Sequence, residues 1–152
     1  MAITQAIANA FKKQLLEADQ NFSSSGGDVF KLALYNSSAT LNSATTVYST
    51  NPGGGTNTEV PNSGQYTAGG SDLTGQNTSI ASGVAIVDFA DLSFTGVTLT
   101  ARGALIYNTS SAVTNAAVAV LDFGADKTAT SGTFTVQFPA FTTAAAILRI
   151  SG

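Results

Sequence analysis

The chain has 152 residues, the usual length of one domain, and its 43% hydrophobic residues exclude a disordered chain. Six Lys and Arg against nine Asp and Glu give a net charge of −3, which leaves no basic stripe for a nucleic acid. Because the chain has no Cys and no His, thiolate and imidazole metal sites, thiol catalysis and a Ser-His-Asp triad are excluded.

The low charge also predicts the kind of surface. Only 10% of the residues are charged, against ~25% in an average soluble domain, so hydroxyls, amides and backbone must cover the exterior. Such a surface suits close packing against other proteins. No apolar run approaches the ~20 residues of a membrane helix, and no signal-peptide pattern is visible. We therefore expect a protein that is made and kept in a cytoplasm, without membrane contact.

An amphipathic helix is predicted over residues 3–19. Ile3, Ile7, Phe11 and Leu15 recur at every fourth residue, and side chains at this spacing share one face of a helix. That apolar face either packs on a sheet or docks onto a neighbouring subunit. These four residues are therefore candidate interface residues.

The first strand is predicted over residues 28–36, after a Ser/Gly connector at residues 23–27. Alternation places Phe30, Leu32 and Leu34 on the inward face. Lys31 and Tyr35 fall on the outward face with Val29 and Ala33, so Lys31 and Tyr35 are candidate contact residues. A further short strand is expected around residues 46–48.

Residues 51–83 differ in composition from the rest of the chain, with eight Gly, two Pro and one aromatic residue, Tyr66. Long loops of this kind in compact domains are usually functional or disordered. The segment is either a surface excursion with brief strands near residues 65–68 and 78–81, or a projecting contact loop in which Tyr66 meets a partner.

The second half of the chain predicts consecutive strands joined by short turns. Residues 133–138 alternate cleanly, as in a half-buried strand, whereas the runs at 105–107 and 117–123 are apolar on both faces and should be covered on both sides. Further strands are expected at 84–89, 91–94 and 144–150. The predicted fold is therefore mainly β: one domain over residues 1–152, with a β-sandwich or jelly roll at 28–150 and one N-terminal helix.

Few residues suggest a catalytic or metal-binding role. Asp88 and Asp122 each end an apolar strand, so they are either an acid–base pair of a glycosidase or turn carboxylates, with Arg102 as an internal ion-pair partner. The turn and ion-pair interpretation is favoured, because such sites also need sugar-stacking aromatics and the chain has no Trp. Asp spacings here do not match a calcium loop. We predict no catalytic residue, no metal and no cofactor.

Seven segments together carry a resemblance to a known family. They are ITQAIANAFKKQLLEADQNF, GDVFKLALYNSSATL, YTAGGSDLTG, VAIVDFAD, TARGALIYN, AVAVLDFGADK and FTVQFPA, in this order along the chain. The set resembles a family of small virion structural proteins of tailed bacteriophages, and ARGALIYN and AVLDFGADK are its most specific pieces.

The resemblance implies a capsid decoration (cement) protein that binds the major capsid protein on the outer face of the head. It implies a homo-oligomer, with a trimer favoured, in a virion assembled in the host cytoplasm. It also implies no enzymatic activity. A tail, baseplate or fibre-adaptor component that binds tail proteins is the alternative within the virion. A carbohydrate-binding or hydrolytic module that uses Asp88 and Asp122 is the alternative from another class.

Overall fold

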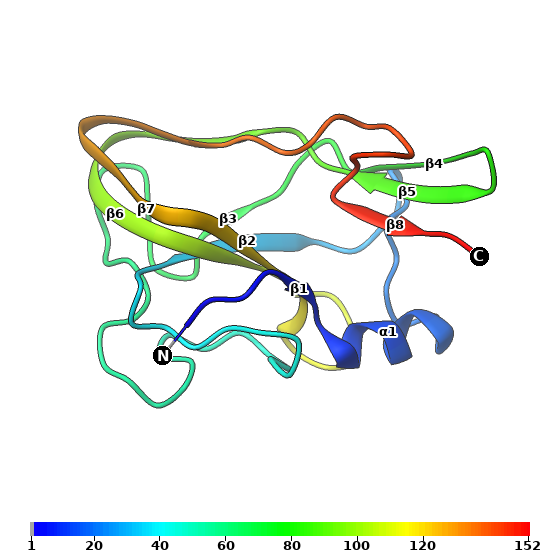
Figure 1. The fold of residues 1–152 in the computed structure, drawn as a ribbon, viewed down its shortest axis with the longest axis horizontal. Coiled ribbons are helices and arrows are strands. Elements are labelled where there is room, and N and C mark those ends of the chain that lie inside the picture. Colours follow the sequence, from blue (N-terminus) through cyan, green and yellow to red (C-terminus); the bar gives the residue numbers. More distant parts are fainter. Residues whose placement is uncertain (1) are drawn as a thin grey trace.

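Two antiparallel sheets and one short helix make up the structure, a computed structural model that describes residues 2–152 (Figure 1). The larger sheet has the order β1-β7-β6-β2-β3, and the smaller has the order β4-β5-β8. Strands and isolated β-bridges together hold 44% of the chain, which confirms a mainly β, sandwich-like domain with a single helix near the N-terminus. The elements in chain order are β1 Ala6–Ile7, α1 Asn9–Leu16, β2 Phe30–Tyr35, β3 Ser71–Asp72, β4 Asn77–Ala81, β5 Val84–Asp88, β6 Leu92–Asn108, β7 Ala116–Val136 and β8 Leu148–Ile150.

A long bent hairpin, β6 with β7, dominates the fold. Register shifts interrupt the ladder, among them one between Phe94 and Val97, and Gly96 and Ser131 have positive φ there. Bulges of this kind bend a strand without ending it. Figure 1 shows both strands of the hairpin bending at the end of the molecule away from α1. The predicted strands at 91–94 and 105–107 are therefore parts of one strand, as are those at 117–123 and 133–138.

The N-terminal helix is shorter than predicted. It spans residues 9–16 instead of 3–19, because the preceding residues pair with strands. The Thr4 amide donates to the Leu41 carbonyl at 2.9 Å, and Ile7 of β1 lies opposite Ala119 of β7. This helix falls well short of the length and apolarity needed to cross a bilayer.

Strand β2 is covered on both faces, so the predicted outward face is wrong for Ala33 and Tyr35, which are fully buried. Two segments explain the burial: the Tyr35 hydroxyl donates to the Ser49 carbonyl, and the excursion over residues 51–83 runs along the edge of this strand. Its Val60 amide donates to the Leu34 carbonyl at 2.9 Å. Within the excursion only residues 71–72 and 77–81 form strands, and the strand predicted near 65–68 reduces to a single bridge between Ser63 and Tyr66.

An aromatic cluster fills the core where the two sheets and the helix meet. Phe22 stacks on Phe30 with ring centroids 4.4 Å apart, and both meet Phe89 edge-on. Phe11 of α1 meets Phe22 edge-on at 5.9 Å, and Phe138 packs on Phe89. Each buried ring removes a large apolar area from water, so this cluster fixes α1 against the sandwich.

Candidate contact groove

A hollow of about 470 Å³ lies between α1 and the three-stranded sheet, and we call it the groove. Phe11, Lys12 and Leu15 of α1 form one wall, with Ile7 of β1 beside them. Residues of β4, β5 and β8 form the other wall. Apolar side chains therefore line a cavity large enough for several residues of another chain or a small ligand.

The inner face of the small sheet continues past the core, and this is why the groove is apolar. Cross-strand pairs share a face of a sheet, and the pairs here are Val87 with Leu148 and Ala85 with both Ile80 and Ile150. Leu148 is buried, but Ile150 is 59% exposed. The sheet thus supplies more apolar surface than its own chain covers.

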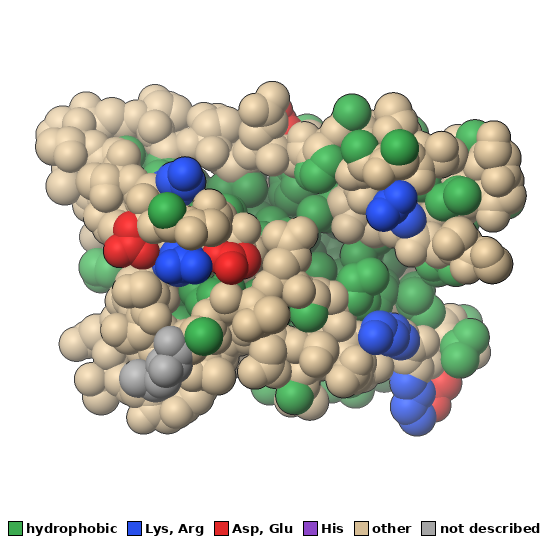
Figure 2. Space-filling view, viewed as in Figure 1, with side chains coloured by type: hydrophobic (Ala, Val, Ile, Leu, Met, Phe, Trp, Pro, Cys, Tyr) green, Lys and Arg blue, Asp and Glu red, His purple; other side chains and the backbone are tan. Residues whose placement is uncertain are grey.

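Three exposed apolar side chains surround this end of the molecule. Leu16 at the end of α1 is 91% exposed, Ile80 on β4 is 74% exposed and Ile150 on β8 is 59% exposed, the three highest values among the large hydrophobic residues described. Figure 2 shows apolar surface between α1 and the small sheet. Single exposed apolar residues are ordinary, but a group around one hollow is typical of a contact site.

The charges at the groove have one sign. Lys12 and Arg149 line it, and no carboxylate does. Lys12 donates to the side-chain oxygen of Asn9 at 3.2 Å, and Arg149 Nη1 donates to the Thr143 carbonyl at 3.1 Å. Neither belongs to any of the three ion pairs found within residues 2–152. This face is therefore cationic in a chain of net charge −3.

The structure brings three of the predicted interface residues together. Ile7, Phe11 and Leu15 all line the groove. Phe11 is 2% exposed and is mainly a core residue, whereas Ile7 and Leu15 are partly buried. Ile3 does not line the groove, because it is buried and forms a bridge with Leu41.

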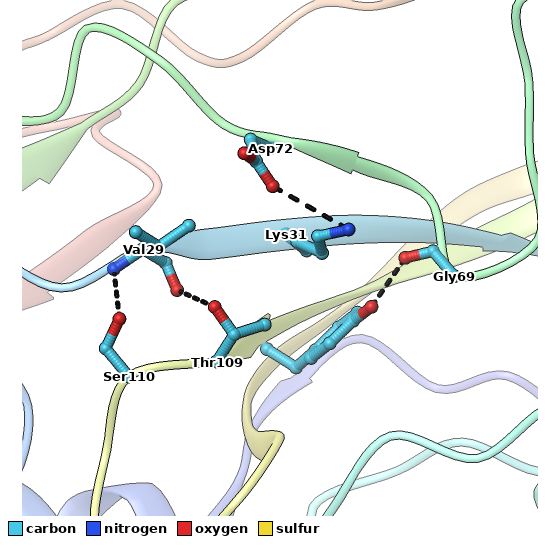
Figure 3. Close-up of polar contacts among 7 residues, drawn as sticks. Val29, Lys31, Gly69, Asp72, Thr109 and Ser110 are labelled. Carbon is cyan, nitrogen blue, oxygen red and sulfur yellow. Dashed lines mark hydrogen bonds and ion pairs between the residues drawn. The ribbon is translucent and has the colours of Figure 1, made fainter.

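The predicted contact surface around Lys31 and Tyr35 is only partly exposed. Lys31 Nζ lies 3.8 Å from an Asp72 carboxylate oxygen, an ion pair between β2 and β3 (Figure 3). Tyr35 is fully buried and its hydroxyl donates to the Ser49 carbonyl at 2.7 Å. Its assignment as a contact residue is therefore wrong, since the side chain is used inside the fold.

Tyr66 is likewise buried, and it belongs to a cluster that contains all four tyrosines of the chain. The buried carboxylate of Glu59 is at its centre. Tyr48 donates to one Glu59 oxygen at 2.7 Å, and Tyr66 and the Gly69 amide donate to the other at 3.1 and 2.5 Å. Tyr107 stacks on Tyr48 and donates to the Gly69 carbonyl at 2.5 Å, in the contact drawn at Gly69 in Figure 3. We call Glu59 and the four tyrosines the tyrosine cluster.

Burial in this cluster raises the pKa of every tyrosine. Desolvation is the largest cause in all four, and the negative charge of Glu59 adds to it. These effects, with a smaller one from the charge of Asp72, raise the pKa of Tyr107 to about 12. The hydroxyls therefore act as fixed, neutral hydrogen-bond donors that hold the excursion on the sheet. Nothing in the sequence around Glu59 marks it as buried, so the sequence did not predict this cluster.

Arg102 forms the predicted ion pair with Asp122, with Nε 3.0 Å from Oδ1 across the β6–β7 ladder. The pKa of the Asp122 carboxyl is lowered by the Gly124 amide, which donates to it, and then by Arg102. Asp88 is not part of this pair. It lies on β5 in the other sheet, opposite Asn77, and one of its buried oxygens has no hydrogen-bond partner within residues 2–152.

Residues 2–152 contain no group of three or more His, Cys, Asp or Glu side chains placed to hold a metal ion. Comparisons with models of protein families, with curated proteins and with solved structures gave no match. The groove is therefore the candidate site that the geometry itself provides.

Proposed function

We propose that this chain is a structural protein of a bacteriophage particle, which binds the outer face of the head as a decoration protein. The groove is the observation that supports this proposal best. It is lined by the exposed Ile150 and by two cations, Lys12 and Arg149, and the exposed Leu16 and Ile80 adjoin lining residues at the same end of the domain. A face of this kind binds another protein by burying apolar area and by pairing charge at the rim.

The rest of the exterior fits a protein that attaches to a lattice. Much of the β6–β7 hairpin exposes hydroxyls, and facing side chains bond each other across the strands, as Thr100 does with Thr128 at 2.8 Å. Such a surface carries little charge to attract the packaged genome. In a trimer over a junction between capsomers, each bound groove raises the effective concentration of the next, so that modest contacts add up to stable attachment.

Copy number in purified particles tests this proposal. We expect the chain in virions of the encoding phage, at hundreds of copies per particle if it decorates the head. A handful of copies would place it in the tail, and its absence from particles would contradict a virion role. Quantitative gel analysis of purified virions against a standard of the chain gives the number.

A binding assay tests the surface. Heads stripped of the chain should take up added wild-type protein and should take up Ile150→Lys at least ten-fold less, because the lysine places a charge in the apolar contact. Val47→Lys is the matched control, since Val47 is 40% exposed and does not line the groove. Equal uptake of both variants would show that the groove is not the attachment surface.

A further inference from the structure

Strand β8 has one open edge, and that edge borders two hollows. β8 is the last strand of its sheet and pairs only with β5, while β1 is the last strand of the larger sheet and pairs only with β7. The groove and a second hollow of about 400 Å³ share Ile7 of β1, Arg149 of β8 and Ser151. Among the described residues, none adds a strand to β8 on this side. An open edge presents backbone donors and acceptors that can pair with another chain.

The alternation along β8 specifies what kind of strand fits this edge. Leu148 and Ile150 share a face of the sheet with Val87, and both line the groove, whereas Arg149 shares the other face with Ile86 and borders both hollows. An added strand places its own side chains alternately on the same two faces. Apolar residues would enter the groove beside Leu15, and residues between them would lie opposite Arg149. A carboxylate is favoured there, because opposite charges on facing strands attract.

We propose that the groove binds an extended segment in which apolar and acidic residues alternate, and that this segment pairs with the open edge of β8. Recognition then uses backbone hydrogen bonds for affinity and the groove for side-chain specificity, as in other cases of strand addition. The assignment of this segment to the shell protein of the head rests on the proposed function. The chemistry of the segment follows from β8 and α1 alone.

A second copy of this chain does not fit the edge as well. Two β8 strands paired about Arg149 would bring like charges face to face, which destabilises a strand pair. Among the edge strands β1, β3, β4 and β8, the only acidic residue is Asp72, and it already pairs with Lys31. Asp88 lies on β5, which is paired on both sides, and Asp122 pairs with Arg102. Asp126 on β7 is exposed but lies between Ala125 and Lys127, so it does not belong to a run in which apolar and acidic residues alternate. Within residues 2–152, no edge strand therefore carries the alternating apolar and acidic pattern that this edge favours.

A peptide titration tests the inference without the phage. The probe is a blocked nine-residue peptide in which valine alternates with glutamate, and the control peptide has lysine in place of glutamate. We expect the acidic peptide to bind the wild-type chain and to shift the backbone amide signals of residues 148–150 in NMR spectra. These amides should also become protected from hydrogen exchange. Binding should weaken as salt rises.

Charge variants sharpen the test. Arg149→Glu should bind the acidic peptide at least ten-fold more weakly and should prefer the lysine peptide, whereas Arg149→Lys should keep the wild-type preference. Lys127→Glu is the matched control, because it makes the same charge change on β7, outside the groove. Thermal unfolding confirms that each variant is folded. Equal binding of both peptides, or an unchanged preference in Arg149→Glu, would overturn the inference.

Two further measurements separate this inference from the proposed function. If wild-type chain binds stripped heads and Arg149→Glu binds them equally, the strand-addition inference fails while the decoration role stands. If the acidic peptide binds as expected but the chain is absent from virions, the decoration role fails and the site stands. Sedimentation of the free chain tests whether a second copy of the chain occupies the groove. Self-association that Arg149→Glu abolishes would mean that it does, and would overturn the inference.

Discussion

The tyrosine cluster and the groove differ in how completely the chain covers its own sheets. At the tyrosine cluster, part of the excursion pairs along β2, and both carboxylate oxygens of Glu59 accept hydrogen bonds from within the chain. At the groove, the apolar face of the small sheet extends beyond anything that α1 covers, and Ile80 and Ile150 stay exposed. The first region is closed and the second is open.

The difference shows which part of the molecule is available for a partner. A buried carboxylate with neutral donors around it is stable only while all its hydrogen bonds are made, so the tyrosine cluster resists rearrangement. Gly70 illustrates how tightly this region is packed, since a Cβ there would lie 1.8 Å from the Leu32 carbonyl oxygen. The groove has no such constraint. Substitutions at the tyrosine cluster should therefore change stability, and substitutions at the groove should change binding.

Alkaline pH should produce the largest effect on the closed region. An unfolded tyrosine has a pKa of about 10, and all four values are raised in the fold. Above pH 10 the unfolded chain releases protons that the folded chain keeps, so the free energy of unfolding falls as pH rises. Each tyrosine that stays protonated in the fold contributes a slope of about 1.4 kcal/mol per pH unit, and Tyr107, whose pKa is raised to about 12, contributes less as the pH approaches that value. Together the tyrosines should exhaust a typical stability by about pH 12.

Urea unfolding followed by circular dichroism from pH 8 to pH 12 measures this slope. The variant Tyr66→Phe should show a slope smaller by about a quarter, because one titrating group is gone. Stability that stays level from pH 9 to pH 11.5 would mean that the hydroxyls are not held as neutral donors, and the contrast between the two regions would lose its basis.

Glu59→Ala should produce the next largest effect. It leaves the hydroxyls of Tyr48 and Tyr66 and the Gly69 amide without their acceptor, and we expect a loss of about 3 kcal/mol in the free energy of unfolding. Glu59→Gln keeps an oxygen acceptor and should cost less than half of that. Urea midpoints measure both. Equal losses in the two variants would indicate that side-chain volume, and not hydrogen bonding, holds the cluster together.

Asp72→Ala is the control for this prediction. Asp72 lies in the same excursion but is largely exposed and pairs with Lys31 at 3.8 Å, so its loss should cost less than ~1 kcal/mol. A large loss at Asp72 would show that the whole excursion is marginally stable, and the effect at Glu59 would then say little about the cluster.

Local patterns in the sequence predicted the parts of the fold that local pairing decides. The Arg102–Asp122 ion pair was among the predicted pairs, and in the structure Gly103, next to Arg102, lies opposite Asp122 in the β6–β7 ladder. The strand over residues 84–89 was found because its apolar run is continuous and bounded by turn residues. Both features depend on nearby residues. Arg102 and Asp122 lie on the two strands of one hairpin, and the strand over residues 84–89 is indicated by its own residues.

Long-range pairing decided the features that the sequence did not predict. The four-residue apolar period extends from Ile3 to Leu15, yet residues 3–7 are extended because β7 and Leu41 supply backbone partners. Tyr35 alternates as an outward residue but is buried, because its hydroxyl donates to the Ser49 carbonyl and Glu59 forms a bridge beside it. Periodicity reports which residues share a face, but it does not report whether another segment covers that face.

Ile80→Thr should have the smallest effect on stability, and a matched substitution makes the comparison direct. Ile80 is 74% exposed beside the groove, so the free energy of unfolding should change by no more than about 0.5 kcal/mol. Ile106 is fully buried on β6, and Ile106→Thr makes the same chemical change at a cost of about 3 kcal/mol. Urea unfolding measures both. Because an isolated chain gains nothing from an exposed isoleucine, a near-zero effect at Ile80 means that the apolar surface around the groove serves something other than folding. An effect at Ile80 as large as at Ile106 would instead mean that this chain covers the groove itself, and the open region would then be as closed as the tyrosine cluster.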